Sequence, residues 1–325
     1  MMTTINPLIA PWGRFHLYTF FIDAPSPAVV DTGVASTPAE GIRPELAKLG
    51  ERVEDIEYIL LTHGHIDHLG GAHALWEMTG RRAKVVIHAD DLKYLQARRA
   101  HVDNYLGLRD NYIDNPNAEA EQTAMAATAI SGEMDAHLVV HGGELIDLGG
   151  GVSVEVIHVP GHSMGSVAYR VNTGEVFVGD AVQVHGAANG FPGYEDPGAY
   201  RSSLHRIRGL APTRMFMGHP YRTAEGEPYP VDQDAPTAMR AIEESIAIED
   251  RIHAVARTVL EQGHADATAP YAPFTAIAAQ LGYTGDPTLE PSPFFTTLDG
   301  YRRIYAPEEH PLDTPRGIWE DGRDI

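Results

Sequence analysis

Thr62-His63-Gly64-His65-Ile66-Asp67-His68 is the stretch of this chain that decides its fold. It places three imidazoles and one carboxylate directly after the apolar segment Ile56 to Leu61, which we predict to be a buried strand. Imidazole nitrogen and carboxylate oxygen are ligands for zinc, iron, manganese or nickel. His63 and His65 could share one ion, and Asp67 and His68, turned the other way, a second. The alternative is a polar loop that starts a helix, with Asp67 as its cap.

Three later ligand-type residues each stand at the end of their own predicted strand. His162 follows Val159-Pro160-Gly161, Asp180 follows Phe177-Val178-Gly179, and His219 follows Phe216-Met217-Gly218. A glycine before the ligand lets the backbone turn tightly or approach a neighbour. One strand-end histidine would be a weak signal, but four segments that deliver such residues together predict a metal site.

The composition narrows the function classes. The chain has 325 residues with 43% hydrophobic and 21% charged residues, which is typical of a globular protein. Its net charge of -21 disfavours nucleic acid and anionic membranes as partners, so we expect a small-molecule substrate. There is no cysteine, which excludes Cys-ligated metals and Cys nucleophiles. We see neither a signal peptide nor an apolar run long enough to span a membrane, and therefore expect a cytoplasmic protein.

The order of predicted elements indicates an α/β layered fold with two helical additions. Strands, a helix over Pro38 to Leu49 and a further strand over Lys84 to His88 alternate in the first part of the chain. Residues from about 90 to 132 lack strand signals, and we predict a helical insertion there. Strand patterns resume from His137 to Met217 around a helix over Tyr200 to Leu210. We expect domain limits of 1–235, and of 236–325 for a helical C-terminal extension that packs on the first domain. In that extension we predict two helices, Pro236 to Gln262 and Phe274 to Leu281, followed by Pro-rich loops.

The motifs together resemble those of the metallo-β-lactamase superfamily. The family's His-x-His-x-Asp-His signature stands at His63, His65, Asp67 and His68, and its later metal-binding motifs match at His162, Asp180 and His219. The family's early strand-end Asp matches Asp31 in Val29-Val30-Asp31-Thr32-Gly33. The resemblance covers roughly Phe15 to Pro220, and this combination of motifs is highly specific.

The resemblance implies a four-layer αββα sandwich with the site at one edge of two sheets. It implies one metal on His63, His65 and His162, another on Asp67, His68 and His219, and Asp180 as the bridge. Two Zn²⁺ ions per chain are expected, with Fe or Mn as alternatives, because these donors accept all three. Asp31 either orients a ligand from behind or is a turn-forming Asp.

Residue types favour one branch of the superfamily. The lack of cysteine excludes the zinc β-lactamases that use a Cys ligand, and His65 stands where flavodiiron proteins usually carry Glu. What remains resembles quorum-quenching lactonases and hydroxyacylglutathione hydrolases, in which a metal-bridging hydroxide opens a lactone or cleaves an ester or thioester. Asp67 or a metal-bound water would then protonate the leaving group. The alternatives are a mononuclear iron oxygenase of the persulfide dioxygenase type, an amide or β-lactam hydrolase, and a binding protein that retains metal without turnover.

Several side chains outside the ligand set are open to more than one interpretation. Tyr194 could hydrogen-bond a developing oxyanion or be a packing residue, and His185 could line the pocket or lie on the surface. The aromatic and apolar residues of the insertion could line the pocket, pack its helices, or form a homodimer contact; they are Tyr94, Tyr105, Leu108 and Tyr112.

Overall fold

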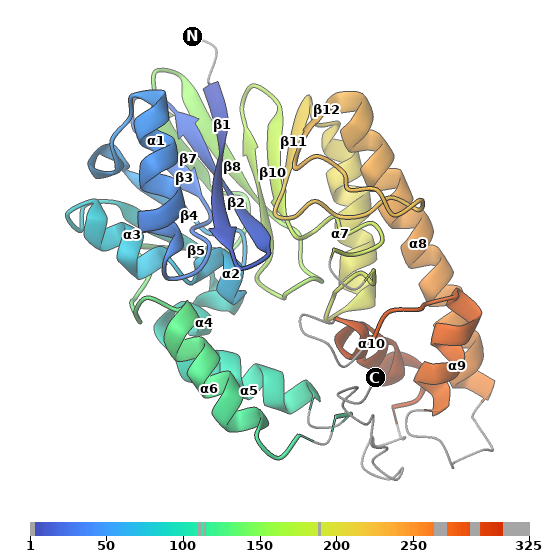
Figure 1. Ribbon diagram of the computed structural model, residues 1–325. Helices are drawn as coiled ribbons and strands as arrows, with labels where there is room; N and C mark the ends of the chain where they lie inside the picture. The colour runs from blue at the N-terminus through green and yellow to red at the C-terminus, as the bar shows by residue number, and fades with distance from the viewer. Residues whose placement is uncertain are drawn as a thin grey trace.

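The structure is a computed structural model that describes residues 4–109, 112–113, 115–187, 190–262, 272–286 and 293–307. Both predicted domains, 1–235 and 236–325, therefore include positions outside the described residues. Two six-stranded sheets face each other in the middle of the molecule, and helices cover their outer faces (Figure 1). This is the four-layer αββα arrangement that the motifs predict.

The first sheet contains the N-terminal strands. Its order is β1 (Thr4–Trp12), β2 (Phe15–Asp23), β3 (Ala28–Val30), β4 (Tyr58–Leu60), β5 (Lys84–His88) and β6 (Leu138–Val140). Strands β1 to β3 pair antiparallel, and β3 to β6 pair parallel. The carboxyl ends of β3, β4 and β5 therefore meet at one edge, where the loop that follows β4 carries the histidine motif.

The second sheet is built from the later strands. Its order is β12 (Asp232–Asp234), β11 (Arg214–Met217), β10 (Glu175–Gly179), β9 (Val167–Val171), β8 (Val152–His158) and β7 (Leu145–Gly149). Only β10 and β11 pair parallel in this sheet. Asp180 and His219 follow directly on these two neighbouring strands, so they leave the sheet side by side.

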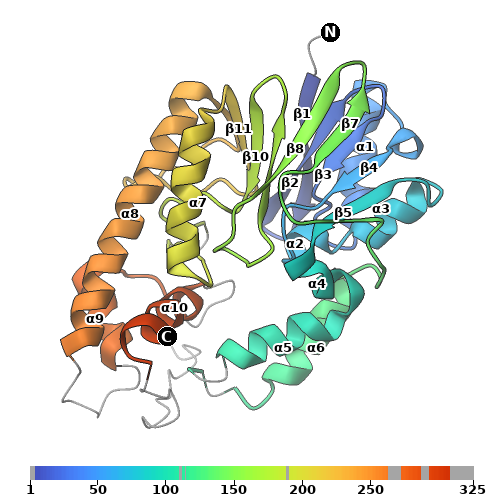
Figure 2. The ribbon, with the colours of Figure 1, turned by 180° about the vertical axis from the view of Figure 1, so that it is seen from behind.

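The helices fall into groups around the two sheets. Figures 1 and 2 show α1 (Arg43–Leu49) and α3 (Ala72–Met78) beside the first sheet, and α7 (Pro197–Leu210) and α8 (Ala235–Gln262) beside the second. The short α2 (Ile66–Leu69) carries Asp67 and His68. The remaining helices lie below the end of the sandwich that carries α2. On one side are α4 (Leu92–Gln96), α5 (Arg98–Arg109) and α6 (Ala118–Ala129), and on the other are α9 (Ala272–Leu281) and α10 (Phe294–Tyr305). The predicted helical insertion is confirmed.

Successive side chains along a strand point to opposite faces of its sheet and therefore enter different hydrophobic cores. Phe20 of β2, Phe177 of β10 and Phe216 of β11 meet between the sheets, with ring centroids 4.7–5.6 Å apart. The next residue along β2, Phe21, points to the helices that cover the first sheet. Met215 and Met217 of β11 likewise face the outer core with α7 and α8. This period-two division is what a sheet buried on both faces requires.

Among the elements that the sequence patterns missed are strand β1 and helix α10. Strand β1 contains Pro7 and Pro11, which interrupt a strand signal, but it lies at the edge of its sheet, where a missing N–H is tolerated. Helix α10 lies in the part predicted as Pro-rich loops, and it buries Phe294, Phe295 and Leu298. The prediction of loops throughout that part was therefore wrong for Phe294–Tyr305.

The insertion and the C-terminal helices are joined by a buried polar contact. The Tyr112 hydroxyl, between α5 and α6, donates to the Asp299 carboxylate on α10, and its ring stacks on Phe295 at 5.3 Å. Residues on both sides of the predicted limit at 235 share one hydrophobic core. The described helices include none with both the length and the hydropathy of a membrane-spanning segment.

Candidate metal centre

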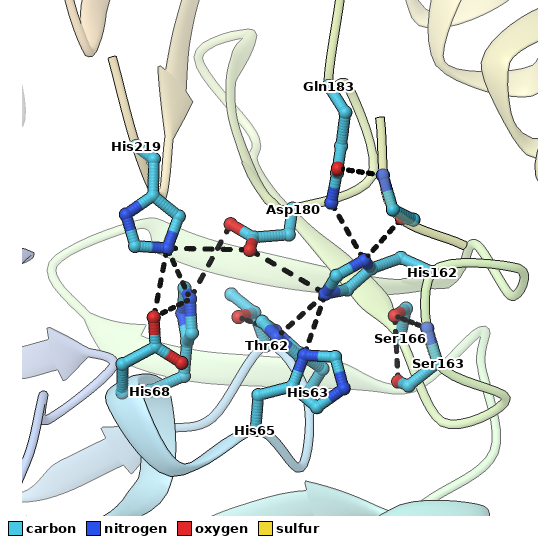
Figure 3. A network of polar contacts seen from close by, with 12 residues as sticks. Thr62, His63, His65, His68, His162, Ser163, Ser166, Asp180, Gln183 and His219 are labelled. Carbon is cyan, nitrogen blue, oxygen red and sulfur yellow. Dashed lines mark hydrogen bonds and ion pairs between the residues drawn. The ribbon is translucent and has the colours of Figure 1, made fainter. Parts of the chain in front are cut away.

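The seven ligand-type residues converge at one edge of the sandwich, although they come from five segments of the chain (Figure 3). His63 and His65 lie in the loop after β4, and Asp67 and His68 lie on α2. The other three follow β8, β10 and β11, in the order His162, Asp180 and His219. The structure thus brings together every residue that the sequence assigns to the metal site.

A first group consists of His63, His65 and His162. The Nε2 atom of His162 lies 3.2 Å from Nε2 of His63 and 2.8 Å from Nδ1 of His65. Thr62 Oγ1 donates to Asp31, so it accepts from Nδ1–H of His63 at 3.1 Å. This bond leaves the lone pair of His63 Nε2 directed at the other two imidazoles.

A second group consists of Asp67, His68 and His219. The Nε2 atom of His219 lies 3.1 Å from Oδ2 of Asp67 and 3.3 Å from Nε2 of His68. Asp180 lies between the two groups, with Oδ2 3.6 Å from His162 Nε2 and 3.5 Å from His219 Nε2. Its other oxygen, Oδ1, lies 3.5 Å from His68 Nε2. The carboxylate is therefore placed to be shared.

Glycine at two strand ends makes room for this packing. A methyl group on Gly218 would lie 2.3 Å from Asp180 Oδ1, and one on Gly179 would lie 2.6 Å from Thr62 Oγ1. Gly179 also has φ of +50°, a conformation that side chains with a Cβ rarely adopt. In the sequence, each of these glycines follows an apolar run. The structure explains this pattern by the close approach of neighbouring chain segments at the strand ends.

Residues behind the cluster fix the orientation of its imidazoles. Asp31 Oδ2 lies 2.8 Å from His68 Nδ1, and Asp31 Oδ1 accepts from the Thr62 backbone N–H at 2.8 Å. The structure thus confirms that Asp31 orients one of the histidines. On the opposite side, Nδ1 of His162 lies 2.7 Å from the carbonyl oxygen of Gly193 and directs Nε2 toward the cluster.

Asp91 is a supporting residue that the sequence interpretation missed. Its carboxylate accepts from the backbone N–H of Gly64 at 2.6 Å, the Ser163 hydroxyl at 2.7 Å and the N–H of Gly165 at 3.0 Å. It therefore ties the loop of His65 to the loop of His162. The available signal was its position just beyond a parallel strand, β5, which is where Asp31 also stands relative to β3.

The electrostatics of the two groups differ. Burial and the neighbouring imidazole of His65 lower the pKa of His162 to about 3, and burial and His68 lower the pKa of His63 well below its ordinary value. Burial acts to lower the pKa of His68 as well, but Asp180 and Asp31 outweigh it and raise that pKa. The first group is thus neutral and ready to act as ligand, whereas carboxylates dominate the second.

The residues present fit metal ions in their number, spacing and donor type. An ion with tetrahedral bonds of about 2.0–2.1 Å separates its ligand atoms by about 3.3 Å. The shorter separations within each group, 2.8–3.3 Å, are close to this value. Asp180 Oδ1 is buried without a hydrogen-bond partner among the described residues, and converging imidazole lone pairs repel each other. Cations would relieve both costs.

A further group, His88, Asp90 and His158, also has its ligand atoms close together. Its geometry suits a metal less well, because the two rings are stacked 4.1 Å apart at 15° and their lone pairs cannot converge. Nδ1 of His88 accepts from the Asp90 backbone N–H, and Nε2 of His158 bonds the Met164 carbonyl oxygen. The cluster of seven is therefore the site that this fold positions for ions.

A cavity of about 640 Å³ opens onto the cluster. Its wall includes Trp12 and Phe15 from the β1–β2 hairpin and Tyr94, Tyr105 and Leu108 from the insertion. The volume lies in the range of small-molecule sites, and most of the wall's exposed area is apolar, although polar and charged side chains also line it. Three of the four insertion residues named from the sequence therefore line the cavity, whereas Tyr112 bonds Asp299.

Two further residues from the sequence interpretation lie apart from the cluster's ligand atoms. Tyr194 borders the cavity, but its side chain is fully buried, and its hydroxyl lies 3.0 Å from that of Tyr301 and not against the ligands. His185 is absent from the cavity wall, and its Nε2 lies 3.1 Å from Glu244. The Tyr194 hydroxyl is therefore paired with a residue of α10, and the His185 imidazole with a residue of α8.

Comparison with known proteins agrees with this geometry. The family model described as the metallo-beta-lactamase superfamily matches residues 14–219. A beta-lactamase-like protein 2 homolog of Drosophila melanogaster is 28% identical over 195 residues, which cover 59% of this chain and 53% of that protein. A hydroxyacylglutathione hydrolase of Cereibacter sphaeroides is 29% identical over 196 residues, covering 60% of this chain and 59% of the relative. The chain thus spans a little over half the length of these two curated relatives.

The fold recurs in solved structures at low sequence identity. A metallo-beta-lactamase family protein from Thermus thermophilus aligns with a TM-score of 0.66 at 19% identity, over 94% of this chain and 96% of that one. A superfamily protein from the archaeon Sulfolobus tokodaii aligns with a TM-score of 0.55 at 19% identity, over 93% and 100%. The segment matched by the family model is more than half of the chain and holds all seven ligand-type residues, so the chain belongs to the metallo-β-lactamase superfamily.

Proposed function

We propose that this protein is a metal-dependent hydrolase with two zinc ions that cleaves a lactone, ester or thioester of a small organic substrate. The observation that carries the proposal is the pair of three-residue ligand groups that share Asp180. A mononuclear iron dioxygenase would need a single ion, typically held by two histidines and one carboxylate, and would leave the second group without a role. The second group, with Asp31 fixed behind His68, supports a second ion.

Each part of the chain has a role in this reaction. When bound, the two ions would supply an activated water and polarise the substrate carbonyl. Asp67 lies at the cavity with its carboxylate 3.1 Å from His219, and the neighbouring His68 and His219 outweigh its burial and lower its pKa. It is therefore ionised and can accept a hydrogen bond from the attacking water, and the proton that this water loses would pass to the leaving group.

The cavity wall and the relatives bear on the substrate class. Trp12, Phe15 and Leu108 present apolar surface to the same cavity as the ligands, and its volume of about 640 Å³ suits an acyl or aromatic group rather than a polymer. A net charge of -21 supports a small molecule over nucleic acid. One relative is named hydroxyacylglutathione hydrolase, and an acylglutathione is a thioester, which supports an acyl-transfer reaction to water.

The test combines metal analysis with an activity screen on the purified chain. We expect about two zinc per chain and turnover of at least one lactone, ester or thioester. H63A and D180A should lose turnover and bound metal, while H205A, which removes an exposed histidine on α7, should retain both. One iron per chain with oxygen uptake would favour the dioxygenase, turnover of β-lactams alone would favour the amide hydrolase, and metal without any turnover would reject the hydrolase.

A further inference from the structure

Tyr221 lies two residues after His219 and is held in place by its backbone. Its N–H donates to the His219 carbonyl oxygen at 2.9 Å, and its own carbonyl oxygen accepts from Tyr229 N–H at 2.8 Å. Its ring lies edge-on to the ring of His219, with centroids 5.8 Å apart and an interplanar angle of 81°. Only 2% of the residue is exposed, so its position is set by the same segment that places His219.

The hydroxyl of Tyr221 is buried and has no hydrogen-bond partner among the described residues. Neighbouring tyrosines of the same core differ in this respect. Tyr194 bonds Tyr301, Tyr200 accepts from the Gln183 backbone N–H, and Tyr229 donates to Glu244. A buried unsatisfied hydroxyl is costly, so its presence in a core that could accommodate phenylalanine calls for an explanation.

Asp180 Oδ1 is the matching unsatisfied acceptor. It is buried without a hydrogen-bond partner among the described residues. Asp180 and Tyr221 both lie against His219, since Asp180 Oδ2 is 3.5 Å from His219 Nε2 and the Tyr221 ring centroid is 5.8 Å from that of His219. Burial and the Asp180 carboxylate accordingly raise the pKa of Tyr221 well above its ordinary value. The position of Gly218 shows where this oxygen points, because a methyl there would lie 2.3 Å from it. Oδ1 therefore lies beside Gly218, in the segment that also carries His219 and Tyr221, and 3.5 Å from His68 Nε2, while Oδ2 is within 3.6 Å of both His162 and His219.

We propose that Tyr221 is a positioning residue that donates its hydroxyl hydrogen to Asp180 Oδ1 when the centre is loaded with metal. This inference rests on the proposed function. The terminal torsion of an Asp side chain has only broad preferences, so its carboxylate plane needs an outside restraint. The bond from Tyr221 fixes that plane and keeps Oδ2 directed at the point between the two ligand groups. Supporting bonds of this kind commonly change metal affinity or activity by about 10–100-fold.

The inference predicts an unusual pair of effects for Y221F. The variant keeps the ring in the core but loses the hydroxyl, so zinc affinity should fall about 10–100-fold. The thermal stability of the metal-free chain should stay the same or rise, because an unsatisfied buried hydroxyl has been removed. In the zinc-loaded enzyme kcat should fall while KM stays unchanged, since the hydroxyl acts on Asp180 and not on substrate.

The experiment compares wild type, Y221F and Y229F by zinc competition against a chelator, by thermal melting without metal, and by steady-state kinetics. Y229F makes the same change in the same core, but its hydroxyl bonds Glu244, so zinc affinity should match wild type. Equal zinc affinity in all three proteins overturns the inference and leaves the proposed function standing. Wild type that binds no zinc overturns both. A loss of zinc affinity in Y221F that is matched by an equal loss in Y229F also overturns the inference.

Discussion

The Oδ2 atom of Asp31 lies 2.8 Å from Nδ1 of His68, a residue 37 positions further along the chain. The bond joins the end of β3 to helix α2, and both side chains are buried. It fixes which nitrogen of His68 carries hydrogen and which faces Asp180 and His219. A carboxylate in this place also raises the basicity of the nitrogen that faces the other ligand residues.

Replacing Asp31 with Asn should weaken metal binding without unfolding the chain. Asp31 has φ of +59°, and Asn tolerates this left-handed conformation nearly as well as Asp does. D31N loses the negative charge behind His68 and turns one acceptor into a donor, so we expect about 10–100-fold weaker zinc binding. Chelator competition measures this effect. D23N, at an exposed residue of β2, should bind zinc as wild type does, and D31N affinity equal to D23N would contradict the prediction.

Asp91 should be important for stability as well as for the site. D91A leaves three donors without their acceptor, on Gly64, Ser163 and Gly165. Since each buried unsatisfied donor costs about 1–3 kcal/mol, we expect a loss of several kcal/mol in the free energy of unfolding. Urea denaturation measures it, with D90N at the neighbouring exposed residue as control. A change below about 1 kcal/mol would show that water replaces the carboxylate at no cost.

Substitution of Tyr194 by Phe separates its two interpretations. The hydroxyl bonds Tyr301, whose own hydroxyl also donates to Glu249 at 3.0 Å. We therefore expect Y194F to cost about 1 kcal/mol of stability and to leave kcat within a few fold of wild type. An oxyanion donor would instead lower kcat by about 10²–10³-fold. Steady-state kinetics on any substrate found in the screen distinguishes the two results.

His101 makes the stability of the insertion depend on pH. Its burial lowers its pKa from 6.5 to about 4, and Nε2–H donates to the Tyr94 carbonyl oxygen at 2.9 Å. Because the folded pKa is below the unfolded one, the unfolded chain binds an extra proton between these values. The stabilisation is therefore complete above about pH 6.5 and is lost as the pH falls toward 4. This shift corresponds to about 3 kcal/mol.

H101Q provides the comparison, because the Gln amide can still donate to Tyr94. Between pH 7.5 and 4.5 the wild type should lose about 2–3 kcal/mol more free energy of unfolding than H101Q does. Urea denaturation of the metal-free proteins at both pH values measures the difference, and titration of all other groups cancels in it. Parallel losses in the two proteins would show that His101 does not carry this dependence.

The ligand cluster was predictable because its signal is local. Each ligand follows an apolar run and a turn, so a short stretch such as Phe216 to His219 contains both the strand and the residue it delivers. Asp91 also follows a strand, β5, but it stands after Asp90 at the start of a segment with helical character. Its partners Ser163 and Gly165 lie more than 70 positions away. A contact of that kind cannot be inferred from spacing along the chain.

The same reason explains what the sequence patterns missed or left open outside the site. Whether a proline ends a strand depends on whether that strand lies at a sheet edge, and the position of β1 at the edge becomes visible only once β2 and β3 have paired. The orientation of the Tyr194 hydroxyl depends on Tyr301, 107 residues later. Helix propensity in the segment that forms α10 is interrupted by neighbouring prolines, and the helix is stabilised by burial of its own Phe294 and Phe295.

The bond from Tyr112 to Asp299 bears on how substrate range in this protein can change. The insertion and the last described helix are linked by a buried donor and acceptor, and Arg302 donates to both of them, so a change in either half disturbs a contact that the other half completes. A chimera that takes helices α4 to α6 from one relative and the C-terminal helices from another should fail to assemble its cavity wall. The two segments therefore act as one structural unit, and we expect new substrate specificities to arise when both are exchanged together.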